Sequence, residues 1–251
     1  MASEICDICN GTGWVKHDVP LEHPNFGDVF KCQCESDKYG MQPHQVSGLH
    51  LREIGGFDES MMKRMSFETF DIRGSVRVSK SEQKETLKMA FESARIFSDS
   101  PEGWLFLTGV HGCGKTHLAM AISNVRLKLG DRVFISFVPA LLDHLRATFS
   151  PDSKVPYDEL FEEIKKAPLL VLDDLAAESN THWAEEKLYQ IIVYRHNLRL
   201  PTIITSALNA DQIEAKEPGI GSRLKDQLVV QEAIITAPDY RDQQRGHRPN
   251  K

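Results

Sequence analysis

The sequence predicts an α/β fold in which a parallel β-sheet is flanked by helices, and three observations support this prediction. Short apolar runs that suit strands alternate with helix-like segments through residues 81–235. A glycine-rich loop of the form G-x-x-x-x-G-K-T, residues 109–116, lies between a strand-like run and a helix-like run. A later apolar run, residues 169–172, ends in two carboxylates. Strands that alternate with helices in this way form a parallel sheet that is covered on both faces.

The composition is that of an ordinary globular chain, with 251 residues of which 41% are apolar and 26% are charged. This length has room for one good-sized α/β domain and a small appendage. No apolar run approaches the roughly 20 residues that span a bilayer, and the N-terminus lacks a signal-peptide pattern, so we expect a cytoplasmic protein with no membrane partner. The net charge of −6 argues against a protein that coats nucleic acid by charge alone.

Residues 1–40 carry four cysteines in two pairs and predict a small zinc-binding module. In a cytosolic chain, a C-x-x-C pair followed by a C-x-C pair indicates metal ligands or free thiols rather than disulfides. Four thiolates can close a tetrahedral site, which suits a structural Zn²⁺. The short second spacing leaves open that His17 or His23 replaces one cysteine, and a redox-active C-x-x-C pair or unliganded thiols would also fit the pattern. The predicted ligands are Cys6, Cys9, Cys32 and Cys34.

Residues 41–64 predict a connector with a short helix near residues 60–65, and residues 65–251 form the predicted main domain. Two aromatic residues at its entry, Phe67 and Phe70, could wall an adenine pocket, since a base needs flat apolar surfaces. On spacing alone they are nearly as well explained as core side chains. Residues 81–97 follow, with apolar positions at helical spacing, and predict a helix.

The glycine-rich loop predicts a phosphate-binding P-loop for ATP or ADP. Its glycines let the backbone N–H groups point inward, and the helix after it adds the positive end of its dipole. Lys115 would reach the β- and γ-phosphates, and the Thr116 hydroxyl would hold Mg²⁺. A chance lysine in a glycine-rich turn is the alternative, which the second motif downstream disfavours. The predicted nucleotide-binding residues of the loop are Gly109, Gly112, Cys113, Gly114, Lys115, Thr116 and His117.

The elements after the loop continue the alternation. Residues 132–137 predict a second strand, and residues 139–149 and 157–166 predict two helices. The run 169–174 follows Pro168 and suits a buried parallel strand, whose carboxyl end is where ligands bind in such sheets. Asp173 is therefore expected to hold Mg²⁺ through water, and Asp174 to orient or polarise the attacking water. A solvated acidic strand end is the alternative for either residue alone.

The last third of the chain predicts a helix over residues 183–197, a buried strand over 201–206 and a final strand-like run over 228–235. A short helix precedes the G-S-R-L stretch at residues 221–224. The tail after residue 239 turns basic and polar, and no internal repeat is visible.

The order of these motifs resembles the AAA+ ATPases, and within them the DnaC/DnaI/IstB family of helicase loaders and transposition helpers. The resemblance covers residues 65–245 and rests on GVHGCGKTHLA, LLVLDDLAAE, WAEEKLYQIIVYRHNLRLPTIITS, GSRL and DYR. It implies an AAA+ core without a full helical lid. The cysteine-bearing residues 1–40 resemble the zinc-bearing N-terminal regions of some loaders.

The resemblance also implies roles for two arginines and marks one departure. Arg223 in GSRL matches the arginine finger, which reaches the γ-phosphate held by a neighbouring subunit and so implies self-association. Arg241 in DYR matches the sensor-2 arginine, which touches the nucleotide of its own subunit. Surface arginines are the alternative for both. The family's usual Thr-Ser-Asn is replaced by Thr205, Ser206 and Ala207. Thr205 or Ser206 must therefore position the hydrolytic water, and we expect weak basal ATPase activity.

The function implied by this resemblance is ATP-dependent loading of the replicative DNA helicase onto single-stranded DNA. Arg146 or Lys154 are candidate DNA contacts, and the absence of tandem stacking aromatics predicts a modest, salt-sensitive DNA affinity. A transposition helper of the IstB kind, which binds duplex DNA and a transposase, is the alternative; the cysteine module favours the loader. A zinc-containing adaptor with little turnover is a third hypothesis, and a small-metabolite kinase fits poorly.

Overall fold

The computed structural model describes residues 14–16, 29–31, 57, 59–74, 80–149, 156–175 and 181–241. The chain divides into two units, Met1–Leu49 and His50–Lys251. The expected boundaries at residues 40 and 64 remain predictions. The four predicted zinc ligands, Cys6, Cys9, Cys32 and Cys34, lie outside the described residues, as does Lys154.

The first unit contains a short antiparallel hairpin. Its strands are β1 (Trp14–Lys16) and β2 (Val29–Lys31). The register pairs Trp14 with Lys31 and Lys16 with Val29, so the first residue of β1 lies opposite the last residue of β2.

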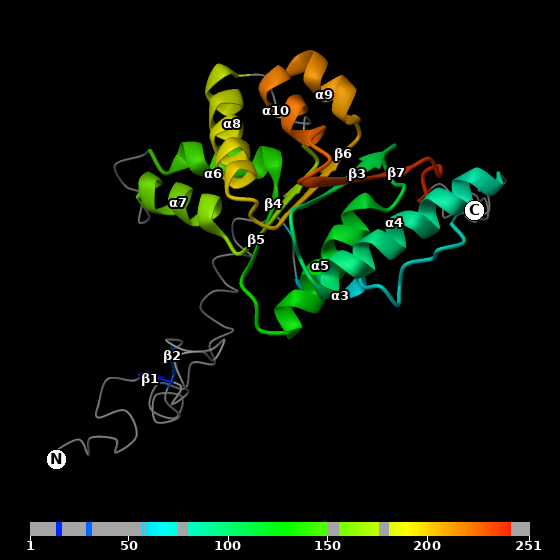
Figure 1. Cartoon of the computed structure of the whole chain (residues 1–251), viewed down its shortest axis with the longest axis horizontal. Coiled ribbons are helices and arrows are strands. Elements are labelled where there is room, and N and C mark those ends of the chain that lie inside the picture. Colours follow the sequence, from blue (N-terminus) through cyan, green and yellow to red (C-terminus); the bar gives the residue numbers. More distant parts are fainter. Residues whose placement is uncertain are drawn as a thin grey trace, which may run out of the picture. The chain divides into compact units, whose positions relative to one another are not determined.

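The second unit is built on a five-stranded sheet in the order β4-β5-β6-β3-β7 (Figure 1). All four strand pairs are parallel, which confirms the predicted parallel sheet. The strands are β3 (Trp104–Gly109), β4 (Val133–Phe137), β5 (Leu169–Asp173), β6 (Thr202–Ser206) and β7 (Val230–Ile235). This order places β3 between β6 on one side and β7 on the other.

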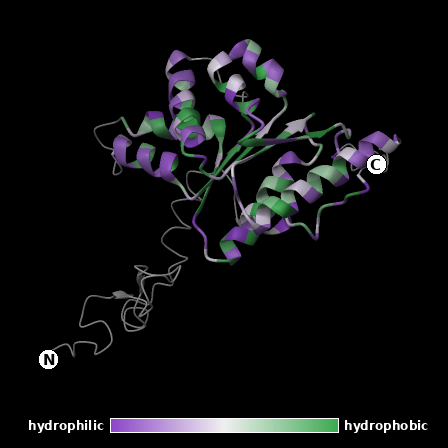
Figure 2. Ribbon diagram, viewed as in Figure 1, coloured by the Kyte–Doolittle hydropathy of each residue, from purple (hydrophilic) through white to green (hydrophobic). Residues whose placement is uncertain are grey.

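Helices cover both faces of the sheet, as Figure 1 shows. One face is covered by α3 (Glu59–Arg64), α4 (Ser81–Asp99) and α5 (Lys115–Lys128). The other is covered by α6 (Val138–Ala147), α7 (Tyr157–Lys166), α8 (His182–Asn197), α9 (Ala210–Lys216) and α10 (Pro218–Leu224). Successive strand residues alternate between the two apolar cores: Leu105 and Leu107 face the first, and Trp104 and Phe106 face the second. β3, β4, β5 and β6 are buried on both faces and are largely apolar, which Figure 2 shows in green, whereas the edge strand β7 has exposed residues at Gln231, Glu232 and Ile234.

Arg195, near the end of α8, is fully buried, although its place in a basic helix end suggests a surface residue. Its guanidinium donates to the carbonyl oxygens of Lys165 (2.9 Å), Ala167 (2.8 Å) and Pro201 (2.6 Å) and to Thr202 Oγ1 (2.9 Å). Burial lowers its pKa to about 9. The side chain thus holds together the end of α7, the approach to β5 and the start of β6.

We expect Arg195→Met to cost about 3 kcal/mol or more of unfolding free energy, because the carbonyls of Lys165 and Ala167 and the Thr202 hydroxyl lose the hydrogen bonds that Arg195 donates. Urea denaturation measures this loss. Arg199→Met is the matched control, since Arg199 is exposed and its replacement should change stability by less than about 0.5 kcal/mol. Equal stability of the two variants would show that the four hydrogen bonds of Arg195 contribute little.

Candidate nucleotide-binding site

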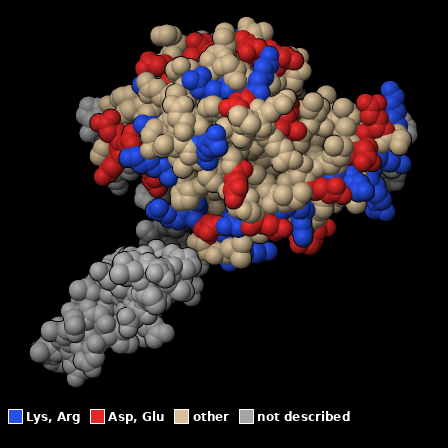
Figure 3. Space-filling view, in the orientation of Figure 1, with Lys and Arg blue, Asp and Glu red and all other residues tan. Residues whose placement is uncertain are grey.

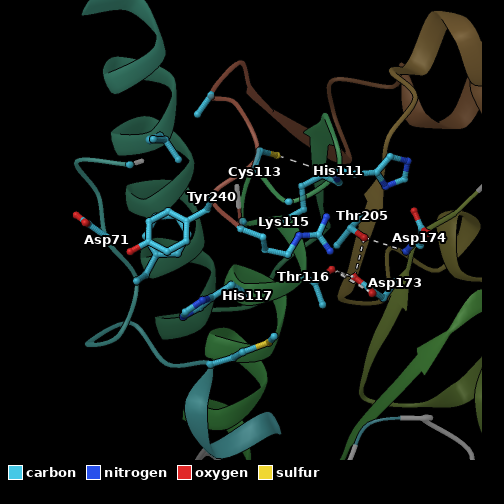
Figure 4. A pocket seen from close by; sticks show the side chains of 18 of the residues that line it. Asp71, His111, Cys113, Lys115, Thr116, His117, Asp173, Asp174, Thr205 and Tyr240 are labelled. Atoms are coloured by element: carbon cyan, nitrogen blue, oxygen red, sulfur yellow. Dashed lines mark hydrogen bonds between the residues drawn. The ribbon is translucent and has the colours of Figure 1, made fainter. Parts of the chain in front are cut away.

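A cavity of about 510 Å³ lies where β3, β5 and β6 end. Four segments make up most of its lining: residues 57–74, the P-loop with the start of α5, the ends of β5 and β6, and the C-terminal residues 237–241. Leu87 of α4 and Phe137 of β4 complete it. Figure 4 shows Lys115, Thr116, Asp173, Asp174 and Thr205 gathered at one side of this cavity. Asp71 and His117 lie toward the other side, with Tyr240 and Cys113 in between. The cavity therefore has a charged end and a more apolar end.

The P-loop adopts the backbone conformation that its glycines allow. Gly109, Gly112 and Gly114 all have positive φ, at 141°, 75° and 111°. At Gly114, a side chain would also meet the ring of Phe70 at 2.8 Å, so the loop and the aromatic wall can touch only because this residue is glycine. The loop leads directly into α5, whose N-terminus faces the cavity and favours an anion there.

Lys115 is the first residue of α5 and is 6% exposed. Its ammonium donates to the carbonyl oxygens of Gly109 (2.7 Å) and Val110 (2.9 Å), which hold the positive charge at the mouth of the loop. The neighbouring Thr116 Oγ1 donates to Asp173 Oδ1 at 2.9 Å. A cation for phosphate and a hydroxyl–carboxylate pair for a metal thus lie side by side.

Asp173 ends β5 and is 5% exposed. It accepts hydrogen bonds from Thr116 and from Thr205 Oγ1 (2.8 Å). Burial raises its pKa above the usual range, and the Asp174 carboxylate adds to the rise. A buried carboxylate held only by hydroxyl groups is short of positive charge, and oxygen ligands are those that Mg²⁺ prefers. Asp173 and Thr116 therefore fit a magnesium ion.

The end of β6 completes the charged end of the cavity. Thr205 donates to Asp173 and accepts from the backbone N–H of Asp174 at 2.9 Å. That bond holds Asp174 in the left-handed region, with φ at 62°, a conformation that is strained for a residue other than glycine. Ser206 instead donates to the Leu175 carbonyl at 2.7 Å and does not line the cavity. Of the two hydroxyls beside Ala207, only that of Thr205 faces the site.

Phe67 and Phe70 have different positions. Phe70 lines the cavity, and its ring lies 5.3 Å from that of His117. Phe67 is 6% exposed, does not line the cavity and packs edge-on against Phe91 in the core. The apolar end is completed by Phe57, Met61 and Met65.

Two polar residues of α5 fix this apolar end to the P-loop helix. His117 Nε2 lies 2.9 Å from the Ser66 carbonyl, and burial lowers the pKa of its imidazole. The neutral ring then donates its Nε2 proton to that carbonyl. Asn124 donates to the carbonyls of Met62 (2.7 Å) and Met65 (2.8 Å). The sequence analysis assigned no role to Asn124. Its spacing of seven residues from His117 places both side chains on one face of α5, and this spacing could have indicated a shared role.

The two arginines that the resemblance singled out lie in different places. Arg241 lines the cavity. Arg223 lies on α10 outside the cavity and is half-buried, with its guanidinium 5.4 Å from the centre of the Tyr189 ring. It cannot be counted among the residues around the nucleotide cavity of its own chain.

A family model described as "IstB-like ATP binding protein" matches residues 84–246, about two thirds of the chain. The chain belongs to this IstB-like family. The replicative helicase loader DnaC of Escherichia coli K12 is 26% identical over 163 residues, 65% of this chain and 62% of that protein. The helicase loader DnaI of Bacillus subtilis is 26% identical over 162 residues, 62% of this chain and 51% of that protein. The match thus spans about half to three fifths of the length of these relatives.

Solved structures agree with the family assignment. A crystal structure of DnaI matches with a TM-score of 0.56 and 28% identity, over 74% of this chain and 95% of that chain. A crystal structure of the DnaC helicase loader matches with a TM-score of 0.54 and 25% identity, over 70% and 98%. Both share the AAA+ core with this IstB-like chain. Among its described residues, no helix is long and apolar enough to cross a bilayer.

We expect Asp173→Asn to stabilise the protein without nucleotide at pH 7 by about 1 kcal/mol, which raises Tm by about 2–4 °C, and to abolish magnesium-dependent nucleotide hydrolysis. The substitution removes a buried negative charge and keeps an oxygen that accepts from Thr116 and Thr205. Thermal unfolding and a phosphate-release assay measure the two effects.

The stability gain has a defined pH dependence. Because the folded-state pKa of Asp173 is raised from 3.8, the wild-type protein loses stability as pH rises from that value through the folded pKa. The gain of the variant should be complete above the folded-state pKa and should disappear below 3.8, where the carboxyl is protonated in both states. Asp174→Asn is the matched control: Asp174 is only half-buried and its charge only adds to the rise in the Asp173 pKa, so its removal should give a smaller gain. A clearly destabilised Asp173→Asn would contradict the account of this carboxylate.

Proposed function

We propose that this IstB-like protein is an ATP-dependent loader of the replicative DNA helicase onto single-stranded DNA. The proposal rests on one combined observation. The cavity unites a P-loop lysine with a buried carboxylate suited to magnesium, and the relatives DnaC and DnaI are named helicase loaders. A transposition helper that binds duplex DNA is the alternative, which neither of these two relatives favours.

In this proposal the charged end of the cavity holds the triphosphate of ATP. Lys115 and the N-terminus of α5 bind the phosphates, and Thr116 with Asp173 hold Mg²⁺, which neutralises charge on the phosphate oxygens. Asp174, held by Thr205, orients the attacking water. Because Ala207 offers no side-chain hydrogen bond and Ser206 faces away, Thr205 has to share this task, and we infer weak basal hydrolysis.

Arg223 completes the site of a neighbouring subunit in the proposed assembly. It lies outside its own cavity, and its Nε has no hydrogen-bond partner among the described residues. The cation lies over Tyr189 on the short helix α10, and its Nη1 donates to the Gly219 carbonyl at 2.5 Å. A planar cation in the neighbour's site would neutralise charge that spreads over the phosphoryl oxygens during hydrolysis.

Single-stranded DNA requires a separate surface, and we infer one from an aromatic–basic cluster on α6, α7 and α8. Phe149 is 55% exposed, stacks on Tyr157 with 4.5 Å between ring centres and meets Trp183 at 6.0 Å. The Arg146 guanidinium lies 5.1 Å from the Trp183 ring, and Lys187 lies 5.9 Å from that of Tyr157. An exposed aromatic ring such as Phe149, with cations nearby, is the kind of feature that binds single strands without reading sequence.

The charge distribution supports binding by stacking more than by a basic face. On the face drawn in Figure 3, Lys and Arg side chains are interspersed with Asp and Glu side chains. The net charge of −6 agrees with this picture. Binding is expected to weaken as salt concentration rises, with a slope set by the small number of phosphates that these cations neutralise.

The first unit is proposed to bind zinc and the helicase. Its hairpin pairs Trp14 with Lys31, and Cys32 follows Lys31 directly while Cys9 precedes Trp14 by five residues. The two cysteine pairs thus adjoin the same end of the hairpin in the sequence. A zinc ion bound by both pairs would close that end, which a hairpin of two three-residue strands needs for stability.

The function is tested by capturing the protein with the replicative helicase of its own source, with ATP and with ADP. Wild-type protein is expected to co-purify with the helicase in a nucleotide-dependent manner. Lys115→Ala should remove the nucleotide dependence, and Cys9→Ser should lose both zinc and helicase while the main domain stays folded. Capture of a cognate transposase and no helicase would overturn the proposal.

Arg223→Ala serves as the matched variant in the same preparations, because Arg223 lies outside its own cavity. It should bind ATP as the wild type does but lose the hydrolysis that appears on assembly. Normal hydrolysis by this variant would exclude Arg223 as the residue that acts on a neighbour.

Phe149→Ala is expected to weaken binding to a single-stranded oligonucleotide by about 1–3 kcal/mol, the usual contribution of one stacked base. Fluorescence anisotropy at two salt concentrations measures this loss. Leu198→Ala is the control, since Leu198 is 55% exposed, as Phe149 is, but lies at the C-terminal cap of α8 and carries no ring. Unchanged affinity in Phe149→Ala would exclude the aromatic–basic cluster as the DNA site.

A further inference from the structure

The C-terminal segment, residues 237–241, lies against the P-loop, and the sheet register explains why. β7 runs parallel to β3, with Ile235 opposite Gly109, so the chain after β7 leaves the sheet beside the loop. The backbone N–H of Tyr240 then donates to the Gly112 carbonyl at 3.0 Å. This hydrogen bond fixes the segment to the middle of the P-loop.

The Asp239 carboxylate occupies the space next to Gly112. A side chain built on Gly112 would come within 1.8 Å of Asp239 Oδ1, and the positive φ of 75° already favours glycine there. The Asp239 side chain is 30% exposed, so its charge is only partly screened by water. A carboxylate therefore lies against a loop whose expected ligand is an anion.

The same carboxylate holds Arg241. Arg241 Nε donates to Asp239 Oδ1 and Arg241 Nη2 donates to Oδ2, both at 3.1 Å, and the backbone N–H of Arg241 donates to Oδ1 at 2.9 Å. Two parallel hydrogen bonds of this kind fix both the position and the orientation of a guanidinium. Because Arg241 lines the cavity, Asp239 sets where its positive charge lies.

We propose that Asp239 is a positioning residue that holds Arg241 beside the P-loop and competes with nucleotide phosphate for it. The inference rests on the proposed nucleotide binding. When a triphosphate enters, Arg241 moves from the carboxylate to a phosphate oxygen, and the carboxylate is left close to a second anion. Both changes oppose binding, so Asp239 lowers the affinity for nucleotide. The position of Arg241 then depends on whether phosphate is bound.

A second turn of the same kind provides a control within the chain. Asp71 Oδ1 accepts from the backbone N–H of Arg73 (3.0 Å) and from Arg73 Nε (3.2 Å), and the Asp71 side chain is 28% exposed. Figure 4 shows Asp71 on the side of the cavity away from Asp173. Asp71→Asn thus removes the same charge from a turn of the same kind. Asp71 lines the cavity at the end away from Asp173, where a ligand without a base makes no contact.

The test is a binding titration of full-length protein with a fluorescent ATP analogue, with competition by inorganic tripolyphosphate, which has no base. Asp239→Asn keeps an oxygen that accepts the Arg241 N–H and should tighten tripolyphosphate binding by about threefold to tenfold. Arg241→Gln should weaken it. In the Arg241→Gln background, Asp239→Asn should gain clearly less than in the wild-type background, because only the charge repulsion, and no ion pair, is left to remove. Asp71→Asn should change tripolyphosphate affinity by less than about twofold.

The outcomes separate this inference from the proposed function. If the wild-type protein binds neither ATP nor tripolyphosphate, the proposed function is wrong. If it binds both, and Asp239→Asn is folded with unchanged or weaker affinity, the role of Asp239 is wrong. An equal gain with and without Arg241 would also overturn it, because simple charge repulsion would then suffice. Should Asp239→Asn unfold, Asp239→Ser retains an acceptor oxygen and carries the same expectation.

Discussion

The hydrogen bonds of Asp173 are the interaction on which the site depends, because they join three elements that are distant in sequence. Thr116, just after β3, and Thr205, at the end of β6, both donate to the carboxylate at the end of β5. β6 lies between β5 and β3, so these bonds cross three adjacent parallel strands. A P-loop alone would bind phosphate. The distance from that loop to the predicted metal ligand is set by the strand order, and a different order would separate Thr116 from Asp173.

The two opposite charges of the site are each held by neutral groups. Lys115 bonds to backbone carbonyls and Asp173 bonds to hydroxyls, and neither forms a salt bridge among the described residues. Such charges are costly to bury, as the raised pKa of Asp173 shows. Arg195 is a contrasting case, because its guanidinium makes four hydrogen bonds to neutral acceptors and does not line the cavity. Incomplete neutralisation at Lys115 and Asp173 is what a magnesium–phosphate ligand would complete.

The sequence predicted the sheet, the P-loop and the Asp173 strand because each is encoded locally, by apolar runs and by residue types at fixed spacing. It could not reveal Arg195 as a core residue, since its acceptors are mostly backbone carbonyls, which carry no residue signature. The sequence also could not predict that Phe149 stacks on Tyr157 and contacts Trp183, because these rings come from separate parts of the chain that only tertiary packing brings together. The same holds for Asp239, because only the pairing of β7 with β3 brings it next to the P-loop.

The apolar end of the cavity also has a consequence for how nucleotide could influence the rest of the chain. The wall formed by residues 57–70 is held to α5 by His117 and Asn124, so it is fixed to the same helix that carries Lys115 and Thr116. That wall begins only a few residues after the first unit ends at Leu49. A base that packs against Phe70 would therefore act on the segment with the shortest covalent path to the first unit. The phosphate end reaches the same wall through α5, which carries Lys115 and Thr116 as well as His117 and Asn124. A signal from the nucleotide to the first unit along the chain would therefore pass through this wall, whether it starts at the base or at the phosphates.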